Sequence, residues 1–426
     1  LTPECVVDSR FVGEKKSVNH SATKVVFFTF VAVIDDAMIR LFYLFIASCL
    51  CLSTVSGCEK PDEIRPGAYS LEEYVPMLEG KRIGILTNHT GLIGEEHLVD
   101  VLHGMGIDIR IIFAPEHGFR GTADAGEHVG DEVDGKTGIK VYSLYKSKAG
   151  KPTAESMKGL DVVLFDLQDV GLRYYTYYIS MYRMMDACAD HDVAFVVLDR
   201  PNPNGFYVDG PLLDMKFKSG VGYLPIPVVH GMTLGELALM INGEHWLPGG
   251  KQCRLSVIPC RGYRHSSKYT LPVAPSPNLP TMKAVYLYAS TCFFEGTNVS
   301  LGRGTEFPFQ VYGSPDLRGY DFSFTPRSLP GAKNPPHLNR LCYGKDLRTV
   351  PDELLWEEGV NLTYVIDAYR SSPDKSGFFT SFFEKLIGVD YVRPMIESGK
   401  SHAEIRACWQ EDVASFKEKR RPHLIY

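Results

Sequence analysis

The sequence predicts an α/β protein in which a Rossmann-like domain with a mostly parallel sheet precedes a smaller C-terminal α+β auxiliary domain. Short runs rich in Val, Ile and Leu alternate with stretches of helical character, as expected when helices cover both faces of a parallel sheet. The length of 426 residues favours two domains over a single core. The Pro-rich segment 272–280 can continue neither a helix nor a central strand, so we place the domain boundary near residue 282.

The first 58 residues have the character of a leader. From Met38, a short basic start is followed by an apolar run over residues 41–55 and by small residues that lead into Cys58. This order is typical of an export signal, and the run is shorter than the roughly 20 residues that span a membrane. Val-Ser-Gly-Cys resembles the lipobox of bacterial lipoproteins, which implies cleavage before Cys58 and lipid on its sulfur. The alternative is a plain secretory signal that happens to contain Cys.

We therefore expect an exported protein that is lipid-anchored to a bacterial membrane and faces the periplasm. Residues 1–37 show no sensible organisation ahead of Met38, and we expect them to be a mis-called upstream extension, with the export signal over residues 38–57. A short polar tether, residues 59–68, is expected to join the anchor to the first domain.

The Rossmann-like domain is expected over residues 69–282. Within it, several apolar runs have the length and composition of buried strands. Stretches of helical character lie between them, and the last begins with a capping box formed by Thr233 and Glu236. The expected strands cover residues 81–88, 107–113, 161–166 and 193–198, and the expected helices cover residues 95–105, 178–189 and 233–241.

The auxiliary domain is expected over residues 283–426, where Gly- and Pro-rich turns precede a helix over residues 401–419. The first strand of the Rossmann-like domain leads into Thr-Asn-His-Thr-Gly, without the Gly-x-Gly-x-x-Gly turn that binds dinucleotides. The fold class therefore brings no evidence for NAD, and we expect no cofactor.

Composition argues against several classes of partner and site. The net charge of −6 offers no basic face to nucleic acid. Cysteines beyond the leader form no Cys-x-x-Cys pair, which argues against a zinc ribbon or a thioredoxin motif. A metal site would depend on histidines that only the fold brings together, because no fixed His spacing is present. These histidines are His89, His117, His128 and His230, and we expect no metal.

Polar side chains gather just after each of the four expected strands. In an open parallel sheet, ligands bind beyond the carboxyl ends of the strands, where the strand order reverses. Asp and Asn also make turns and cap helices, and this alternative applies most to Asn202 and Asn204. The polar residues are Asn88 and His89, then Glu116 and His117, then Asp166, Gln168 and Asp169, then Asp199, Arg200, Asn202 and Asn204.

Several carboxylates are candidates for acid–base catalysis. Glu116 follows a Pro on a loop directly after an apolar strand, and half-burial there would raise the pKa of its carboxyl group, as suits a general acid. Asp169 lies three residues beyond Asp166 on the loop of the third strand, and Glu295 in the auxiliary domain would face the cleft from the other side. We predict Glu116 as the general acid, with Asp169 or Glu295 as the second carboxylate.

Arg173 leads the run Arg-Tyr-Tyr-Thr-Tyr-Tyr, which contains Tyr175. A cation beside aromatic rings would form a platform for an anionic sugar. The alternative is the start of an amphipathic helix with half of its tyrosines in the core. Arg303 lies in another Gly-flanked loop, which resembles a phosphate-binding turn only weakly.

Four long motifs run through the chain: Ala-Pro-Glu116-His117-Gly-Phe-Arg120-Gly, Asp166-Leu-Gln168-Asp169-Val-Gly-Leu-Arg173-Tyr-Tyr-Thr, Leu-Asp199-Arg200-Pro-Asn202-Pro-Asn204-Gly and Phe-Glu295-Gly-Thr-Asn298-Val-Ser-Leu-Gly-Arg303-Gly-Thr. Together they make the chain, from about residue 69 onward, similar to the NamZ family. The resemblance implies an exo-acting β-N-acetylmuramidase that releases N-acetylmuramic acid from the non-reducing ends of peptidoglycan glycan fragments. It also implies a site in the cleft between the two domains, with the family's glutamate of the Glu-His-Gly motif at Glu116.

Physical chemistry agrees with this resemblance. Glycoside hydrolysis generally needs an acid and a second carboxylate on either side of the scissile bond. The lactyl group of muramic acid is itself a carboxylate, so an Arg fork is expected near the bound sugar. Arg173, Arg200 and Arg303 are the candidates for that fork. The other predicted substrate contacts are Asn88, His117, Asp166, Tyr175, Asn202 and Asn298.

Two alternatives remain open on the sequence. The first is a metal-dependent sugar hydrolase or deacetylase that uses His117 and the Asp residues after the third strand. The second is a non-catalytic peptidoglycan-binding lipoprotein that uses the Tyr run as its binding surface.

Overall fold

A seven-stranded sheet is central to the computed structural model, which describes residues 63–115, 119, 132–144 and 150–426. Its strand order is β5-β6-β4-β1-β7-β8-β9, and all neighbours are parallel except β5 and β6. The parallel strands follow the order of a doubly wound dinucleotide-binding sheet. Their bounds are β1 Ile83–Thr87, β4 Ile109–Ala114, β6 Lys140–Ser143, β7 Val162–Asp166, β8 Ala194–Leu198 and β9 Leu255–Ile258, with β5 at Glu132–Val133.

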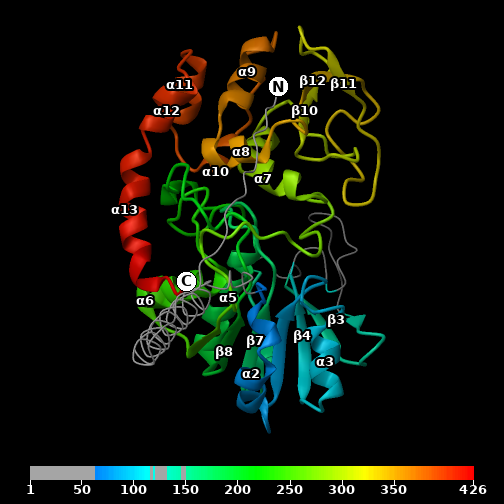
Figure 1. The fold of residues 1–426 in the computed structure, drawn as a ribbon, viewed down its shortest axis with the longest axis vertical. Helices are drawn as coiled ribbons and strands as arrows, with labels where there is room; N and C mark the ends of the chain where they lie inside the picture. Colours follow the sequence, from blue (N-terminus) through cyan, green and yellow to red (C-terminus); the bar gives the residue numbers. More distant parts are fainter. Residues whose placement is uncertain (1–62, 116–118, 120–131, 145–149) are drawn as a thin grey trace, which may run out of the picture. The chain divides into compact units, whose positions relative to one another are not determined.

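Helices cover both faces of this sheet, which explains its continuous apolar strands (Figure 1). On one face, Ile85 and Leu164 pack in a core with side chains of two helices, α2 (Leu71–Leu78) and α3 (Leu98–Gly104). On the other face, Leu86 and Val163 belong to a second core with α4, α5 and α6. These three helices are α4 Ala154–Met157, α5 Tyr177–His191 and α6 Leu234–Gly243.

The predicted fold class is confirmed, and so are the four expected strands, within one to two residues at their ends. The capping box of Thr233 and Glu236 is present at α6. The helix expected over residues 95–105 is partly wrong. Its first residues belong to a hairpin of β2 (Leu92–Ile93) and β3 (Glu96–His97), which turns at Gly94 with φ +62°, so α3 starts only at Leu98.

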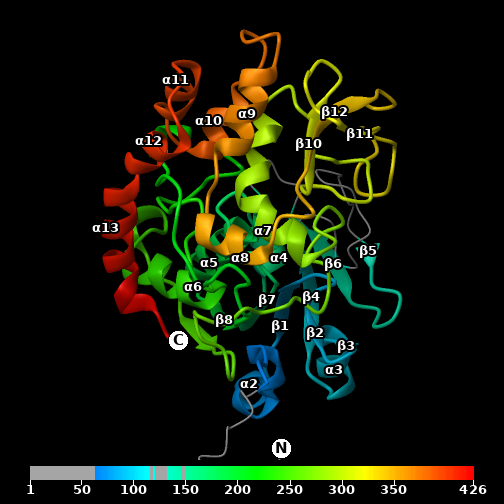
Figure 2. The same ribbon diagram turned by 45° about the horizontal axis from the view of Figure 1, so that its top comes forward.

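The second half of the described chain starts with α7 (Met282–Thr291) and contains a small antiparallel sheet in the order β10-β12-β11. Helices lie on one side of that sheet, and the last of them lead the chain back to α6, beside which the chain ends (Figure 2). The elements are β10 Val311–Ser314, β11 Phe322–Phe324, β12 Cys342–Asp346, α8 Asp352–Glu358, α9 Thr363–Ser371, α10 Phe382–Ile387, α11 Val392–Glu397, α12 His402–Ala407 and α13 Gln410–Arg420.

The helix expected over residues 401–419 is in fact two, because the chain breaks at Trp409 between α12 and α13. The Trp409 indole is fully buried and donates from Nε1 to Asp209 Oδ1 at 2.8 Å. Asp209 also accepts from Val360 N and Arg406 Nη2. This buried carboxylate therefore links the C-terminal helices to the half that contains the seven-stranded sheet. The core on the α5 face of that sheet continues into the C-terminal half.

Among the residues that the structure describes, no helix combines the length and the apolar composition needed to cross a bilayer.

Candidate active site

The strand order reverses at β1, because β4 lies on one side of it and β7 on the other. Asn88 directly follows β1 and is fully buried. Its Oδ1 accepts from Thr90 N at 3.0 Å and from Thr90 Oγ1 at 2.6 Å, while its Nδ2 donates to the Tyr177 hydroxyl at 2.7 Å. Asn88 thus shapes the turn after β1 and holds Tyr177, rather than presenting a free amide.

Asp166 and Arg200 form a buried ion pair at the ends of β7 and β8. Arg200 Nε lies 2.5 Å from Asp166 Oδ1, and Nη2 lies 2.9 Å from Oδ2. The side chains are 5% and 0% exposed for Arg200 and Asp166 respectively. Arg200 Nη2 also donates to the Leu92 carbonyl at 3.1 Å. The pair therefore joins the ends of β7 and β8 to the β2–β3 hairpin. Both residues were predicted to contact substrate, and this enclosed position does not fit that role.

Asp169 stands out electrostatically among the polar residues after β7. Its Oδ1 accepts from Gly171 N at 2.7 Å, and its buried Oδ2 has no hydrogen bond within the described part of the chain. Burial raises the pKa of this carboxyl group to about 7, against the lowering effect of the Gly171 and Val170 backbone N–H groups. Such a group holds a proton near neutral pH, as a general acid requires.

We predict that Asp169→Asn stabilises the protein at pH 8. Because the folded pKa of about 7 lies above the usual 3.8, the favourable contribution of this group is full below pH 3.8 and is lost as the pH rises through 7. Asn stays neutral and can still accept from Gly171 N. Denaturant unfolding should show a gain of roughly 2–4 kcal/mol at pH 8 and a smaller gain at pH 5.

Asp346→Asn is the matched control, because the pKa of Asp346 is lowered, chiefly by its hydrogen bonds from Arg348. That variant should lose stability at pH 8. If Asp169→Asn destabilises the protein equally at both pH values, the inferred protonation of Asp169 is incorrect.

Arg173 occupies a position other than the one predicted. Its side chain is fully buried, and its guanidinium donates to the carbonyls of Pro211, Ile226, Leu386 and Ile387 at 2.7–3.0 Å. Burial lowers the pKa of this guanidinium to about 10. The prediction of a sugar-binding Arg at this position is therefore wrong: Arg173 joins the loop after β7 to the end of α10.

The turn-forming alternative holds for Asn202 and Asn204. Asn202 Nδ2 donates to Met232 O, and its Oδ1 accepts from Asn204 N. Asn204 Nδ2 donates to Val170 O. The backbone of Asn298 is fixed by its N–H, which donates to Phe378 O, and by its carbonyl, which lies 2.8 Å from His337 Nε2; the predicted substrate contact of its side chain stays a prediction.

Two neighbouring cavities share lining residues: the smaller lies where the segment 174–177 after β7 meets the C-terminal half of the chain, and the larger lies within that half. The larger encloses about 630 Å³ and the smaller about 170 Å³. Glu295 and Arg303 line both of them, which makes this ion pair the junction between the cavities. The larger cavity is lined mostly by apolar side chains and by the loop 331–336, and the smaller by Tyr174, Tyr175, Thr176, Tyr177, Ser276, Asn278, Tyr288 and Phe309 among others.

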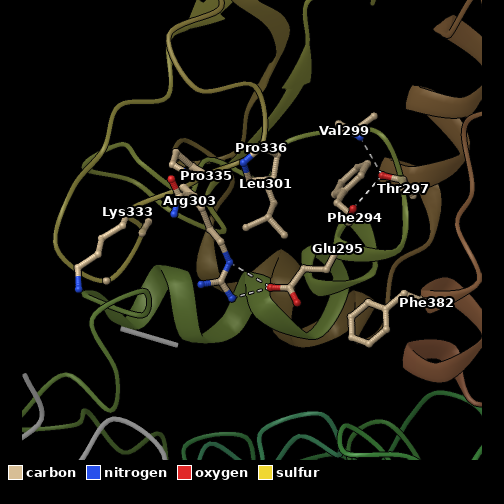
Figure 3. A pocket seen from close by; sticks show the side chains of 13 residues that line it. Phe294, Glu295, Thr297, Val299, Leu301, Arg303, Lys333, Pro335, Pro336 and Phe382 are labelled. Atoms are coloured by element: carbon tan, nitrogen blue, oxygen red, sulfur yellow. Dashed lines mark hydrogen bonds and ion pairs between the residues drawn. The ribbon is translucent and has the colours of Figure 1, made fainter. Parts of the chain in front are cut away.

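Glu295 and Arg303 point toward each other in Figure 3, where Pro335 and Pro336 lie beside Arg303. Arg303 donates to Glu295 Oε1 from Nη2 at 2.6 Å and from Nε at 3.1 Å. The side chains are about one-quarter exposed, 25% for Glu295 and 23% for Arg303. The guanidinium also lies 5.0 Å from the Phe309 ring centre, so the charged pair rests on an aromatic wall and keeps access to the cavities.

The tyrosines of the smaller cavity connect it to the switch point of the sheet. Tyr177 receives the hydrogen bond from Asn88 at the end of β1. Tyr175 is buried and donates to Pro275 O at 2.7 Å, while Tyr174 donates to Tyr288 O at 2.9 Å. Tyr175 thus lines the smaller cavity, and its predicted contact with substrate stays a prediction. Because the hydroxyls of these tyrosines are hydrogen-bonded to neighbouring groups, their rings are what remains to face the cavity. Aromatic rings of this kind suit the apolar face of a sugar.

Glu116, His117, His128 and Cys58 lie outside the described residues, and their predicted roles stay predictions. Of the other histidines, His89 Nε2 lies 2.9 Å from Ala274 O, and His230 is fully buried, which lowers the pKa of its imidazole to about 3. Within residues that the structure describes, no group of three or more His, Cys, Asp or Glu side chains could hold a metal ion.

Sequence reasoning missed the Tyr177–Tyr288–Phe309 wall and the loop 331–336. The Tyr run was a signal for Tyr177, because it continues past Arg173 at the start of a helix. Tyr288 lies inside an ordinary apolar helix pattern, and the loop has no charge pattern that marks it. Only the packing of the two halves brings these residues together.

Two family models match the chain: "Exo-beta-N-acetylmuramidase NamZ, N-terminal" over residues 83–283 and "Exo-beta-N-acetylmuramidase NamZ, C-terminal" over residues 286–426. The chain is similar to the peptidoglycan beta-N-acetylmuramidase NamZ of Bacillus subtilis (strain 168). The two are 38% identical over 375 residues, which cover 84% of this chain and 89% of that relative.

Solved structures agree with this similarity. A DUF1343 family protein of Bacteroides fragilis NCTC 9343 has a TM-score of 0.81 and 56% identity, covering 86% of this chain and 99% of its own. A second DUF1343 family protein from that organism has a TM-score of 0.72 and 27% identity, covering 85% of this chain and 99% of its own.

Proposed function

Because the chain belongs to the exo-β-N-acetylmuramidase NamZ family, we propose that it is a glycoside hydrolase that releases N-acetylmuramic acid from the non-reducing ends of peptidoglycan glycan fragments. The observation that carries the proposed site is the Glu295–Arg303 pair, which lines both cavities at the meeting point of the two halves. This place lies beyond the carboxyl end of β7, where ligands of open parallel sheets bind.

The chemistry of the cavity residues suits this reaction. Hydrolysis of a glycosidic bond requires an acid that protonates the leaving oxygen and a second carboxylate near the sugar ring. In our proposal Glu116 is the general acid, as the family motif implies, and Glu295 is the second carboxylate because it borders both cavities. Asp169 is the alternative partner, because a pKa of about 7 lets its carboxylate take up a proton near neutral pH.

The acid assignment is tested with Glu116→Gln. We predict that this variant turns over a chromogenic N-acetylmuramide about 100- to 10,000-fold more slowly than the wild type, the usual contribution of a positioned acid or base. Gln keeps the size of the side chain, but its amide is far too weakly acidic to transfer a proton to the leaving oxygen. Initial rates measured at saturating substrate check the prediction, and near wild-type activity would remove Glu116 from the mechanism.

Arg303 is the proposed contact of the muramic lactyl carboxylate. It uses two of its five N–H donors on Glu295, so donors remain for a second carboxylate. We predict that Arg303→Met lowers the preference for an N-acetylmuramide over the matching N-acetylglucosaminide, which lacks the lactyl group, by roughly 10- to 100-fold, the value of a charge-assisted hydrogen bond. The measurement is the ratio of kcat/KM for the two substrates.

When Arg303 is replaced, Glu295 loses its partner, and kcat/KM can fall for both substrates alike. The ratio of the two kcat/KM values is unaffected by such a shared loss. Arg348→Met is the matched control, because Arg348 also pairs with a carboxylate, that of Asp346, and lies 4.2 Å from the ring centre of Phe307. The control should leave the ratio unchanged. An unchanged ratio in Arg303→Met would assign the lactyl group to another residue.

We further propose that the protein acts as an exported lipoprotein facing the periplasm. The support is the sequence alone: the short basic start at Met38, the apolar run 41–55 and the lipobox-like residues before Cys58. Mass spectrometry of the N-terminal peptide of the native protein tests this proposal. A diacylated Cys58 as the first residue is expected, whereas an unmodified N-terminus at another residue would overturn it.

A further inference from the structure

One wall of the larger cavity is made by six consecutive residues, 331–336, here named the wall loop. It lies beside Arg303 in Figure 3 and contains neither helix nor strand. Such a segment has no ladder of its own to fix its position. The distance between the wall loop and the Glu295–Arg303 pair, and with it the width of the cavity, is therefore set by contacts with neighbouring segments.

Contacts within the C-terminal half hold parts of the wall loop. Leu329 and Ala332 exchange backbone hydrogen bonds across a tight turn. Pro335 packs on Gly304, where an added Cβ would lie 2.5 Å from Pro335 Cγ. Just after the loop, His337 Nε2 lies 2.8 Å from the Asn298 carbonyl.

Asn278 makes a contact of a different kind, because it comes from the Pro-rich segment 272–280 that precedes α7. Its side chain is buried, and Nδ2 donates to the Gly331 carbonyl at 2.8 Å. Gly331 has φ +82°, and a Cβ added there would lie 2.7 Å from Pro277 Cβ. The start of the wall loop is thus seated closely on Pro277 and Asn278.

The same Pro-rich segment also holds the smaller cavity. The Pro275 carbonyl accepts from the Tyr175 hydroxyl, and Asn278 itself lines that cavity. A segment that binds a tyrosine of one cavity and the wall loop of the other sets the spacing between them. From this juxtaposition we propose that Asn278 is a positioning residue for glycan hydrolysis, which holds the wall loop over Glu295 and Arg303 in the substrate-binding position. This inference rests on the function proposed above.

Loss of the Asn278–Gly331 hydrogen bond should therefore affect substrate binding and not the chemical step. Asn278→Asp is nearly isosteric, but it places a carboxylate oxygen against the Gly331 carbonyl and removes the donor. Glu295 and Arg303 keep their own contacts, since neither bonds to Asn278. We expect KM for a muramic-acid-terminated disaccharide to rise about tenfold, equivalent to about 1.4 kcal/mol, with kcat within about threefold of the wild type.

Gly331→Ala is the second variant, because its Cβ would lie 2.7 Å from Pro277 Cβ and push the wall loop away from that ring, while it would meet Asn278 Nδ2 only at 3.5 Å, an ordinary contact distance that leaves the amide donor in place. It should also raise KM about tenfold. If Asn278→Asp does not fold, the KM of Gly331→Ala tests the positioning role instead. The matched control is Asn242→Asp, whose Nδ2 donates to the Cys253 carbonyl at 2.9 Å, away from both cavities. The control is expected to lower the melting temperature and to leave KM unchanged.

Three results would overturn the inference: a KM within twofold of the wild type in the folded variants, a loss of kcat at constant KM, or an equal rise of KM in the Asn242 control. The wild type is assayed first on the same disaccharide. If it releases no N-acetylmuramic acid, the proposed function fails and this inference fails with it. If the wild type is active and the variants match it, only the role of Asn278 is refuted.

Discussion

Glu295→Gln is expected to lower kcat on an N-acetylmuramide by about 1,000-fold, within the range for a carboxylate that takes part in proton transfer or charge stabilisation. The reason is its position, since Glu295 borders both cavities and remains one-quarter exposed (25%) while paired with Arg303. Gln preserves the volume and can still contact the guanidinium. KM should change little, because the lost interaction is strongest in the transition state. Steady-state kinetics with purified variants measures both constants.

Asp346→Asn provides the matched control. Asp346 accepts from Arg348 Nε at 2.9 Å and from Nη2 at 2.6 Å, in the same half of the chain. Its side chain is 24% exposed, close to the 25% of Glu295, but it lines neither cavity. The control should keep wild-type kcat. A Glu295→Gln variant with kcat within tenfold of the wild type would transfer the role of second carboxylate to Asp169.

The architecture of the first half was predictable because its strands are buried on both faces. The strand Val162–Asp166 has every residue buried, and the sequence indicates this through the continuous apolar residues 162–165 that precede Asp166. The β2–β3 hairpin was not predictable in this way. Its strands have two residues each, and Gly94 was the sole local signal for its turn.

The residues predicted for the site differ in how the fold uses their polar atoms. Polar residues do follow the parallel strands at one edge of the sheet, yet Asn88 uses its amide on Tyr177 and Thr90. Asp166 and Arg200 use their polar atoms on each other and on the Leu92 carbonyl. Sequence cannot separate a polar residue that shapes a loop from one that faces a ligand. Burial separates them: Arg173 is enclosed by four carbonyls, whereas Arg303 keeps 23% of its side chain exposed.

The second large predicted effect is a loss of stability when the buried Asp166–Arg200 ion pair is broken. Asp166→Asn is expected to lower the free energy of unfolding by about 3–5 kcal/mol, because removing one partner leaves the other charge buried and uncompensated. Arg200 is 5% exposed and would retain only the Leu92 carbonyl and its contacts with a neutral amide. Guanidinium chloride unfolding at pH 7 measures the loss.

Asp161→Asn separates this effect from the loss of any Asp–Arg pair. Asp161 accepts from Arg82 Nε at 3.0 Å and Nη2 at 2.9 Å, in the same two-bond geometry, but the side chains are 33% and 49% exposed. Water replaces the lost contacts there, so the unfolding midpoint should hardly move. The double variant Asp166→Leu/Arg200→Met should recover most of the stability, because no buried charge remains. If Asp166→Asn unfolds like Asp161→Asn, the pair is not the buried link between β7, β8 and the hairpin, and Arg200 becomes available again as a substrate contact.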